Sequence, residues 1–233
     1  MGNASSAEEG TGSLGHPNLL SKVTVNGARK ADVDAFLTEG RVDNVQISYN
    51  TKRQHERFIP RNVNRRVVLR HCTLKAVKRN WAMISEQPET QGAVNGMVTP
   101  LVVLYDTFFA RLFMSEPSMR DMFEDNMIRQ SKFLVGLVNI MVGMEGMLKQ
   151  GLAPIYSFAD RSVTMGVRPQ HYEVISDVLP VALEACAGTD GWSKDAYDAW
   201  KDVMNFAILV VVERTVESWG SCHGISLSEV HAI

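Results

Sequence analysis

The spacing of hydrophobic residues changes near residue 73. Residues 1 to about 60 are polar and rich in Asn, Gly and Thr, and they show no sustained periodicity; a stretch around Val42 to Tyr49 is compatible with short strands or turns. From Thr73 onward, apolar residues recur at intervals of three and four, the spacing of helices with one buried face. The pattern therefore predicts a mostly irregular extension followed by a helical domain.

Capping residues and helix-breaking residues set the expected helix boundaries. Thr99 followed by Pro100 is typical of a helix start, and so is Ser193, whereas Gly166 and Gly188 are typical of helix ends. Pro180 lies inside one predicted helix and is expected to kink it. The predicted helices cover residues 73–85, 100–115, 117–123, 127–149, 153–164, 169–187 and 194–218.

This reading gives an all-α fold of seven to eight helices in a single domain across residues 73–218, with an N-terminal arm at 1–72 and a tail at 219–233. The three cysteines are scattered and odd in number, which favours a reducing, cytoplasmic location over a disulfide framework. The longest apolar run, residues 133–144, is too short to span a membrane. We therefore expect a cytoplasmic protein.

Charge is distributed unevenly. The formal net charge is -2, yet residues 41–80 carry a net +9 and residues 81–233 a net −9. Such a basic block can bind an anionic membrane, an acidic polymer such as the tubulin surface, or the acidic face of its own domain. RNA is disfavoured because no aromatic recognition motif accompanies the charge. The candidate residues for an anionic partner are Arg53, Arg57, Arg61, Arg65, Arg66 and Arg70.

The first residues match an acylation pattern. Gly2 follows Met1, and Ser6 supplies the small residue expected at the sixth position, so Gly2 is a candidate for N-myristoylation. One acyl chain gives only marginal membrane binding, and the basic block would supply the second element. A Gly2→Ala variant is then expected to move from the membrane fraction to the soluble fraction.

Several motifs in sequence order resemble those of one known family. The clearest is Gly-Val-Arg-Pro-Gln-His-Tyr at residues 166–172, and Phe-Phe-Ala-Arg-Leu-Phe at residues 108–113 is a second. Trp81, Pro117, Phe123 and Trp200 occupy further characteristic positions. Together they resemble the globins, in particular the flavohaemoglobin, single-domain bacterial and neuroglobin-like lineage. The resemblance implies a globin fold over residues 73–218 and a haem pocket.

The residues at the pocket positions depart from that family. The resemblance places the proximal histidine at Ser162, and a neutral hydroxyl is a poor axial ligand for haem iron. It places the distal residue at Gln130 with Leu134 one turn later, or at Arg129 with Phe133 if the register shifts by one. Phe109 stands where a tyrosine often donates a hydrogen bond. The pocket-equivalent positions are Phe109, Phe123, Gln130, Leu134, Phe158, Ser162, Met165 and Val167.

The sequence favours a non-enzymatic interaction, scaffold or sensor module that binds neither haem nor metal and attaches to a membrane or the cytoskeleton, including a cilium or flagellum. The sequence also allows homo-oligomerisation and the binding of an apolar ligand such as a fatty acid. The alternative is a haem globin that binds oxygen or nitric oxide through another ligand, Met165 or His171. No Walker loop, nucleophile elbow or zinc-type Cys/His spacing indicates an enzyme.

Overall fold

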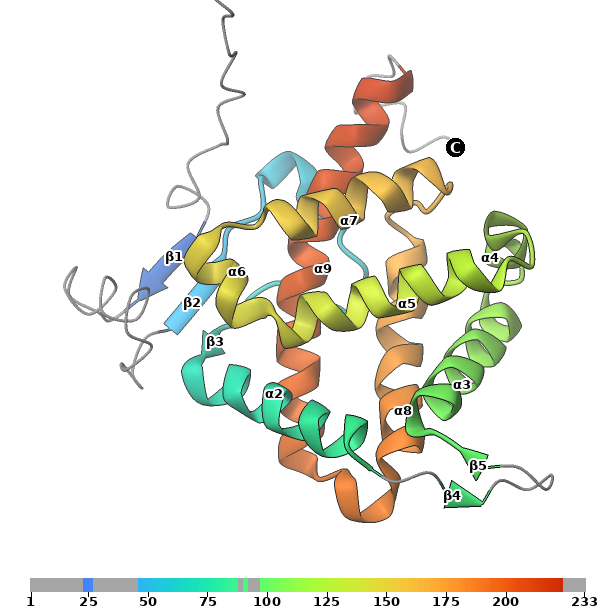
Figure 1. The fold of residues 1–233 in the computed structure, drawn as a ribbon. Coiled ribbons are helices and arrows are strands. Elements are labelled where there is room, and N and C mark those ends of the chain that lie inside the picture. Colours follow the sequence, from blue (N-terminus) through green and yellow to red (C-terminus); the bar gives the residue numbers. More distant parts are fainter. Residues whose placement is uncertain (1–22, 27–45, 88–89, 92–96, 224–233) are drawn as a thin grey trace, which may run out of the picture.

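The computed structural model describes residues 23–26, 46–87, 90–91 and 97–223 (Figure 1). The described residues are mostly helical, which confirms the all-α class. Gly2, where acylation is predicted, lies outside them. The helices are α2 (His71–Ser85), α3 (Pro100–Ser115), α4 (Ser118–Phe123), α5 (Met127–Val142), α6 (Met144–Gln150), α7 (Ala153–Thr164), α8 (His171–Gly191) and α9 (Lys194–His223). The short elements are β1 (Val23–Asn26), β2 (Gln46–Tyr49), the 3-10 helix η2 (Arg53–Phe58), β3 (Leu69–Arg70), β4 (Thr90–Gln91) and β5 (Met97–Val98).

Local signals placed several helix boundaries correctly. The Thr99 hydroxyl accepts a hydrogen bond from the Val102 N–H at 3.3 Å, with Pro100 as the first helical residue. The Ser193 hydroxyl accepts from the Ala196 N–H at 3.1 Å and begins α9. Gly166, just after α7, has a φ of 91°, which L side chains rarely adopt. These caps satisfy backbone groups that a helix end leaves without partners.

The prediction of one helix over residues 127–149 is wrong, because the chain bends by 71° between α5 and α6. Gly143 lies at the bend, and a Cβ atom there would stand 2.8 Å from the Asn139 carbonyl oxygen. No single helix in the described part of the chain is long and apolar enough to span a membrane. The bent pair of α5 and α6 passes this test by length and composition only.

Helices α8 and α9 extend further than predicted. The non-helical residue inside α8 is Gly188, with a φ of 68°, at the position where the sequence predicted a helix end, and Pro180 lies within the helical part. Glycine adopts this φ without strain, so the chain can leave the helical conformation at Gly188. Helix α9 continues past Ser218 to His223, and Tyr197, expected to face inward, is 40% exposed.

The segment before α2 packs on the helices instead of standing apart. Strand β2 pairs antiparallel with β1 and with β3. The Tyr49 ring meets Phe206 of α9 edge to face, with 5.9 Å between centroids. The predicted boundary at residue 72 therefore runs through continuous packing. Apolar side chains of residues 46–70 that join the common core are Ile47, Tyr49, Ile59, Val63, Val67 and Leu69.

Helix α9 forms the centre of the helical arrangement, with α8 beside it (Figure 1). Helices α2 and α7 pack against α9, α3 packs against α8, and α5 crosses in front of both. Asn80 of α2 links three elements: its Oδ1 accepts from Trp200 Nε1 at 2.8 Å, and its Nδ2 donates to the Gly191 carbonyl at 2.8 Å. Because both ends of this buried amide are satisfied, it fixes α2 against α8 and α9.

Candidate functional site

Three of the predicted pocket residues belong to a row of buried rings that reaches from α3 through α4 and α5 to α7. A row of buried phenylalanine rings runs from Phe109 through Phe123 and Phe133 to Phe158, with centroid separations of 5.4, 5.3 and 5.3 Å. Contacts at these distances are favourable ring packing. Phe133, which belonged to the less favoured register, packs its ring on Phe158 of α7.

Helices α5 and α7 approach each other closely at Gly136. A Cβ atom at Gly136 would lie 3.1 Å from Cδ2 of Phe158, so the glycine lets the Phe158 ring rest on α5. Together with the Phe133 ring, Phe158 fills the space between the two helices.

Ser162 is fully buried and turns back on its own helix. Its hydroxyl donates to the Phe158 carbonyl at 2.8 Å. The hydroxyl of Tyr172 lies nearby; burial raises the pKa of Tyr172 to about 12, while hydrogen bonding to Thr215 and Ser162 acts in the opposite direction. The hydrogen-bonding capacity of Ser162 is therefore used inside the protein, so no residue at this position offers haem an axial ligand.

The other residues considered as ligands have structural contacts. Met165 is the half-buried C-cap of α7, and the carbonyl of buried Val167 accepts from Trp219 Nε1 at 3.2 Å. The Nδ1 atom of His171 accepts from the Arg168 N–H at 3.0 Å. Burial lowers the pKa of His171, with the Arg168 charge acting in the same direction and Glu116 against it. The neutral imidazole thus organises the turn before α8.

The predicted distal residues have separated environments. Gln130 is buried, and its Oε1 accepts a hydrogen bond from the Tyr105 hydroxyl. Arg129 pairs with Glu124 at 2.8 Å near the surface. Sequence reasoning missed Tyr105, although it precedes Phe109 by one helical turn and so lies on the same side of α3. Tyr105 therefore supplies, one turn earlier, the hydroxyl that Phe109 lacks, and this hydroxyl is hydrogen-bonded to Gln130.

An apolar groove of about 500 Å³ lies on the other side of α5, between α3 and α5. Leu134, expected in the haem pocket, lines this groove. Several of its apolar side chains are open to solvent, including Leu101 at 50% and Val135 at 56% exposure. We call it the α3–α5 groove; its lining residues are Trp81, Leu101, Val102, Leu104, Tyr105, Asp106, Met127, Ser131, Leu134, Val135, Val138 and Asn139.

The six arginines predicted to meet an anionic partner are all exposed. We call residues 53–70 the arginine segment. The Arg57 guanidinium lies 4.8 Å from the centre of the Phe58 ring, and Arg70 lies near enough to Asp202 to lower the pKa of that carboxyl, against the larger raising effect of burial. Among the described residues, no ion pair is made by Arg53, Arg61, Arg65 or Arg66.

Comparison with known proteins adds no family to this geometry. No protein-family model matches the chain, and no curated protein matches it either.

Proposed function

We propose that this chain is a globin-fold protein closed to haem, which acts as a non-enzymatic interaction module and attaches to an acidic surface through its arginine segment. The observation that carries the proposal is the Phe133–Phe158 contact between α5 and α7, beside a buried Ser162. Rings and a serine stand where a haem protein needs space and an imidazole.

The order and packing of the helices support the comparison with globins. Trp81 of α2 meets Trp200 of α9 edge to face at 6.2 Å between centroids, and these are two of the positions on which the resemblance was based. The short α4 carries Phe123, whose ring contacts both Phe109 and Phe133. Fold analogy of this kind bears on architecture, whereas the serine at position 162, in place of an axial imidazole, bears on function.

Titration with haemin tests the closed pocket. We expect the wild-type chain to give no stoichiometric Soret shift. A Ser162→His variant is also expected to give none, because the Phe158 ring still fills the space, whereas Ser162→His combined with Phe158→Ala opens it. Ser157→His, on an exposed position of α7, is the control for surface binding. A stoichiometric shift in the wild type would favour the alternative haem globin, with Met165 or His171 as the first ligands to replace.

The arginine segment supports attachment to an acidic surface. Lys52 and six arginines face a single acidic residue, Glu56, over residues 46–70. Because Arg53, Arg61, Arg65 and Arg66 form no ion pair with described residues, their charge is available to a partner. Each basic residue near an anionic membrane contributes on the order of 1 kcal/mol.

Co-sedimentation measures this attachment. The variant Arg61→Glu/Arg65→Glu/Arg66→Glu is expected to lose at least tenfold in binding to vesicles that contain phosphatidylserine, or to microtubules if the partner is cytoskeletal. The matched control, Arg111→Glu/Lys132→Glu/Arg161→Glu, makes the same charge change at exposed positions elsewhere. Equal losses in both variants would mean that net charge, and not the arginine segment, determines binding.

A further inference from the structure

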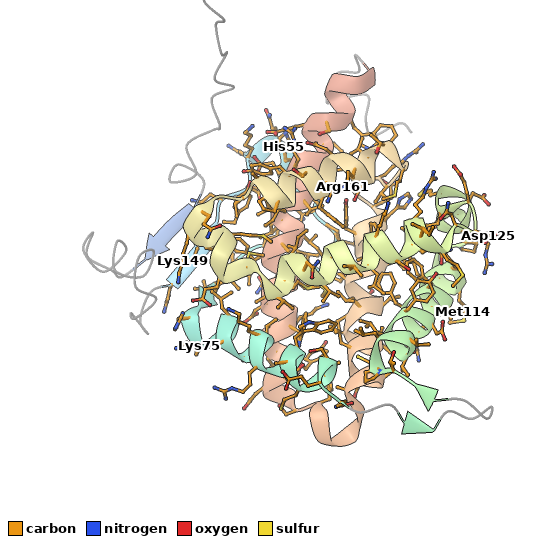
Figure 2. All side chains as sticks on the ribbon, in the orientation of Figure 1. His55, Lys75, Met114, Asp125, Lys149 and Arg161 are labelled. Atoms are coloured by element: carbon orange, nitrogen blue, oxygen red, sulfur yellow. The ribbon has the colours of Figure 1, made fainter. Side chains whose placement is uncertain are left out.

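Three potential metal ligands from distant parts of the chain meet beside α9. His55 belongs to η2, and Glu213 and Glu217 lie one turn apart on α9. One ligand atom from each residue lies within 4.8 Å of the others. In Figure 2, His55 is seen next to the part of α9 nearer its C-terminus. A spacing of four residues places both glutamates on one side of the helix.

This cluster is unusually buried for one that contains two carboxylates. His55 and Glu213 are each 1% exposed, and Glu217 is 30% exposed. Withdrawing carboxylates from water is costly unless cations or hydrogen bonds compensate them. The burial of Glu213 therefore requires a nearby positive charge.

Lys52 provides the nearest positive charge. Its Nζ lies 3.9 Å from Glu213 Oε1 and hydrogen-bonds Glu217, and its backbone N–H donates to Glu213 Oε2 at 3.4 Å. The side chain is 46% exposed, so its ammonium can move into water. Arg214 reaches Glu217 only at 4.0 Å, because it is held by two hydrogen bonds to Asp160. The Lys52 ammonium therefore lies between the two carboxylates, at the place where a metal ion would bind them.

Tyr49 adds a buried hydroxyl beside the same carboxylates. The side chain is 4% exposed, and its hydroxyl has no hydrogen-bond partner among the described residues. Burial raises the pKa of Tyr49, and Glu213 raises it further, because its carboxylate lies close to the hydroxyl. A buried hydroxyl without a partner is uncommon and calls for an ion or water.

We propose that His55, Glu213 and Glu217 bind a divalent first-row transition cation, with Zn²⁺ as the reference ion. One imidazole and two carboxylates form a nitrogen and oxygen donor set of the kind that Zn²⁺ accepts with three protein ligands. Bonds of about 2.0–2.2 Å require each ligand atom to move inward by roughly 1 Å from the present spacing. Lys52 leaves as the ion enters, and the Tyr49 hydroxyl lies beside the open position. Sequence analysis predicted no metal.

The site joins η2 to α9 and is independent of haem binding and of the acidic partner. An ion held there would tie the start of the arginine segment to α9. Calorimetric titration of the full chain with Zn²⁺, after removal of metal by a chelator, tests the site. We expect one ion per chain, with affinity lowered at least tenfold in His55→Ala and in Glu217→Gln.

Two further variants separate metal binding from a structural role. Lys52→Met removes the competing ammonium, so Zn²⁺ should bind at least as tightly as in the wild type even though an ion pair is lost. Glu145→Gln is the matched control and should leave the affinity unchanged: Glu145 is a half-buried carboxylate 3.8 Å from the buried His71, with Lys149 at 3.2 Å.

Circular dichroism checks that each variant is folded. Because Glu217 is partly exposed, Glu217→Gln still tests the site if His55→Ala does not fold. Co²⁺ absorption, compared between the wild type and Tyr49→Phe, reports coordination directly. Binding below one ion per chain, affinity unchanged in Glu217→Gln, or weaker binding in Lys52→Met would overturn the proposal. If the chain binds no metal, the proposed function is unaffected, because the co-sedimentation and haemin experiments test it separately.

Discussion

The two sides of α5 differ in how they are covered. Toward α7, the Phe133 ring and the Phe158 ring are in contact, and Gly136 allows the helices to approach closely. Toward α3, Leu134 and Val135 face a groove of about 500 Å³, and Val135 is 56% exposed. Both sides are apolar, yet one is closed and the other is open.

This difference shows that apolar composition alone does not determine whether a helix surface is covered. Large rings and a glycine close the α7 side, whereas aliphatic side chains leave a gap before α3. Exposed apolar patches of this kind are typical of binding surfaces. The open apolar surface of α5 therefore lies in the groove, on the side opposite to the expected haem pocket.

The largest expected effect comes from opening the closed side. Phe158→Ala removes a ring that is 3% exposed, and the cavity it leaves should lower the free energy of unfolding by about 3–5 kcal/mol. Urea denaturation followed by circular dichroism measures the change. A loss below roughly 1 kcal/mol would mean that the helices collapse into the gap and that the contact does not hold α5 against α7.

A smaller effect is expected from adding one methyl group at the close approach. Gly136→Ala favours the helix by about 0.5–1 kcal/mol but crowds the Phe158 ring, so we expect a net destabilisation of roughly 1 kcal/mol. In the Phe158→Ala background the sign should reverse. Gly146→Ala, with nothing within 4 Å of the added Cβ, is the control and should stabilise both backgrounds equally. Unfolding free energies of the four combinations give the coupling.

The contact of α7 with α9 should contribute less and depend on pH. Burial alone would raise the pKa of Asp160, but hydrogen bonds from Arg214 and Ser218 and the Arg214 charge lower it overall. Its stabilisation is therefore present above the unfolded pKa of about 3.9 and is lost as pH falls through the lower folded pKa. Asp160 is 40% exposed, so Asp160→Asn should cost less than about 1 kcal/mol at pH 7.

Unfolding of Asp160→Asn and wild type at pH 7 and at pH 3 checks this sign. The difference between the two should shrink at low pH. Asp198→Asn, which removes a more exposed pair with Lys194, is the control and should show no measurable change. A difference that grows on acidification would contradict the assigned pKa direction.

The smallest effect on stability is expected in the groove. Val135→Ser should change the unfolding free energy by no more than about 0.5 kcal/mol, because the side chain is already largely exposed. It should nevertheless reduce the fluorescence that an apolar dye gains on binding. Met114→Ser, at a 74% exposed position of α3 that does not line the groove, is the control. Equal dye binding in both variants would show that the dye binds elsewhere.

Helix boundaries were predictable where a single residue encodes them. Thr99, Ser193 and Gly166 act through hydrogen bonds or torsion angles within four residues of themselves. The bend at Gly143 was not predictable in this way, since the apolar spacing continues across it from α5 into α6. Whether a glycine bends a helix depends on which elements the two halves meet.

The site was less predictable because its contacts join distant residues. Sequence placed a serine where an imidazole was expected, and the structure shows how its hydroxyl is used. The sequence did not indicate that Phe133 meets Phe158 or that Tyr105 binds Gln130, since both contacts depend on how the helices cross. The Glu-x-x-x-Glu spacing at residues 213–217 was visible, but nothing local pairs it with His55.

The contact of β2 with α9 has a consequence for the time course of folding. The Tyr49 ring packs on Phe206, so a ring made early in synthesis meets this packing partner only when the last helix has left the ribosome. Closing so long a loop delays the contact, and domains rich in such contacts fold slowly. Until then Ile47 and Tyr49 lack their final cover, and the nascent chain is most exposed to aggregation during this interval.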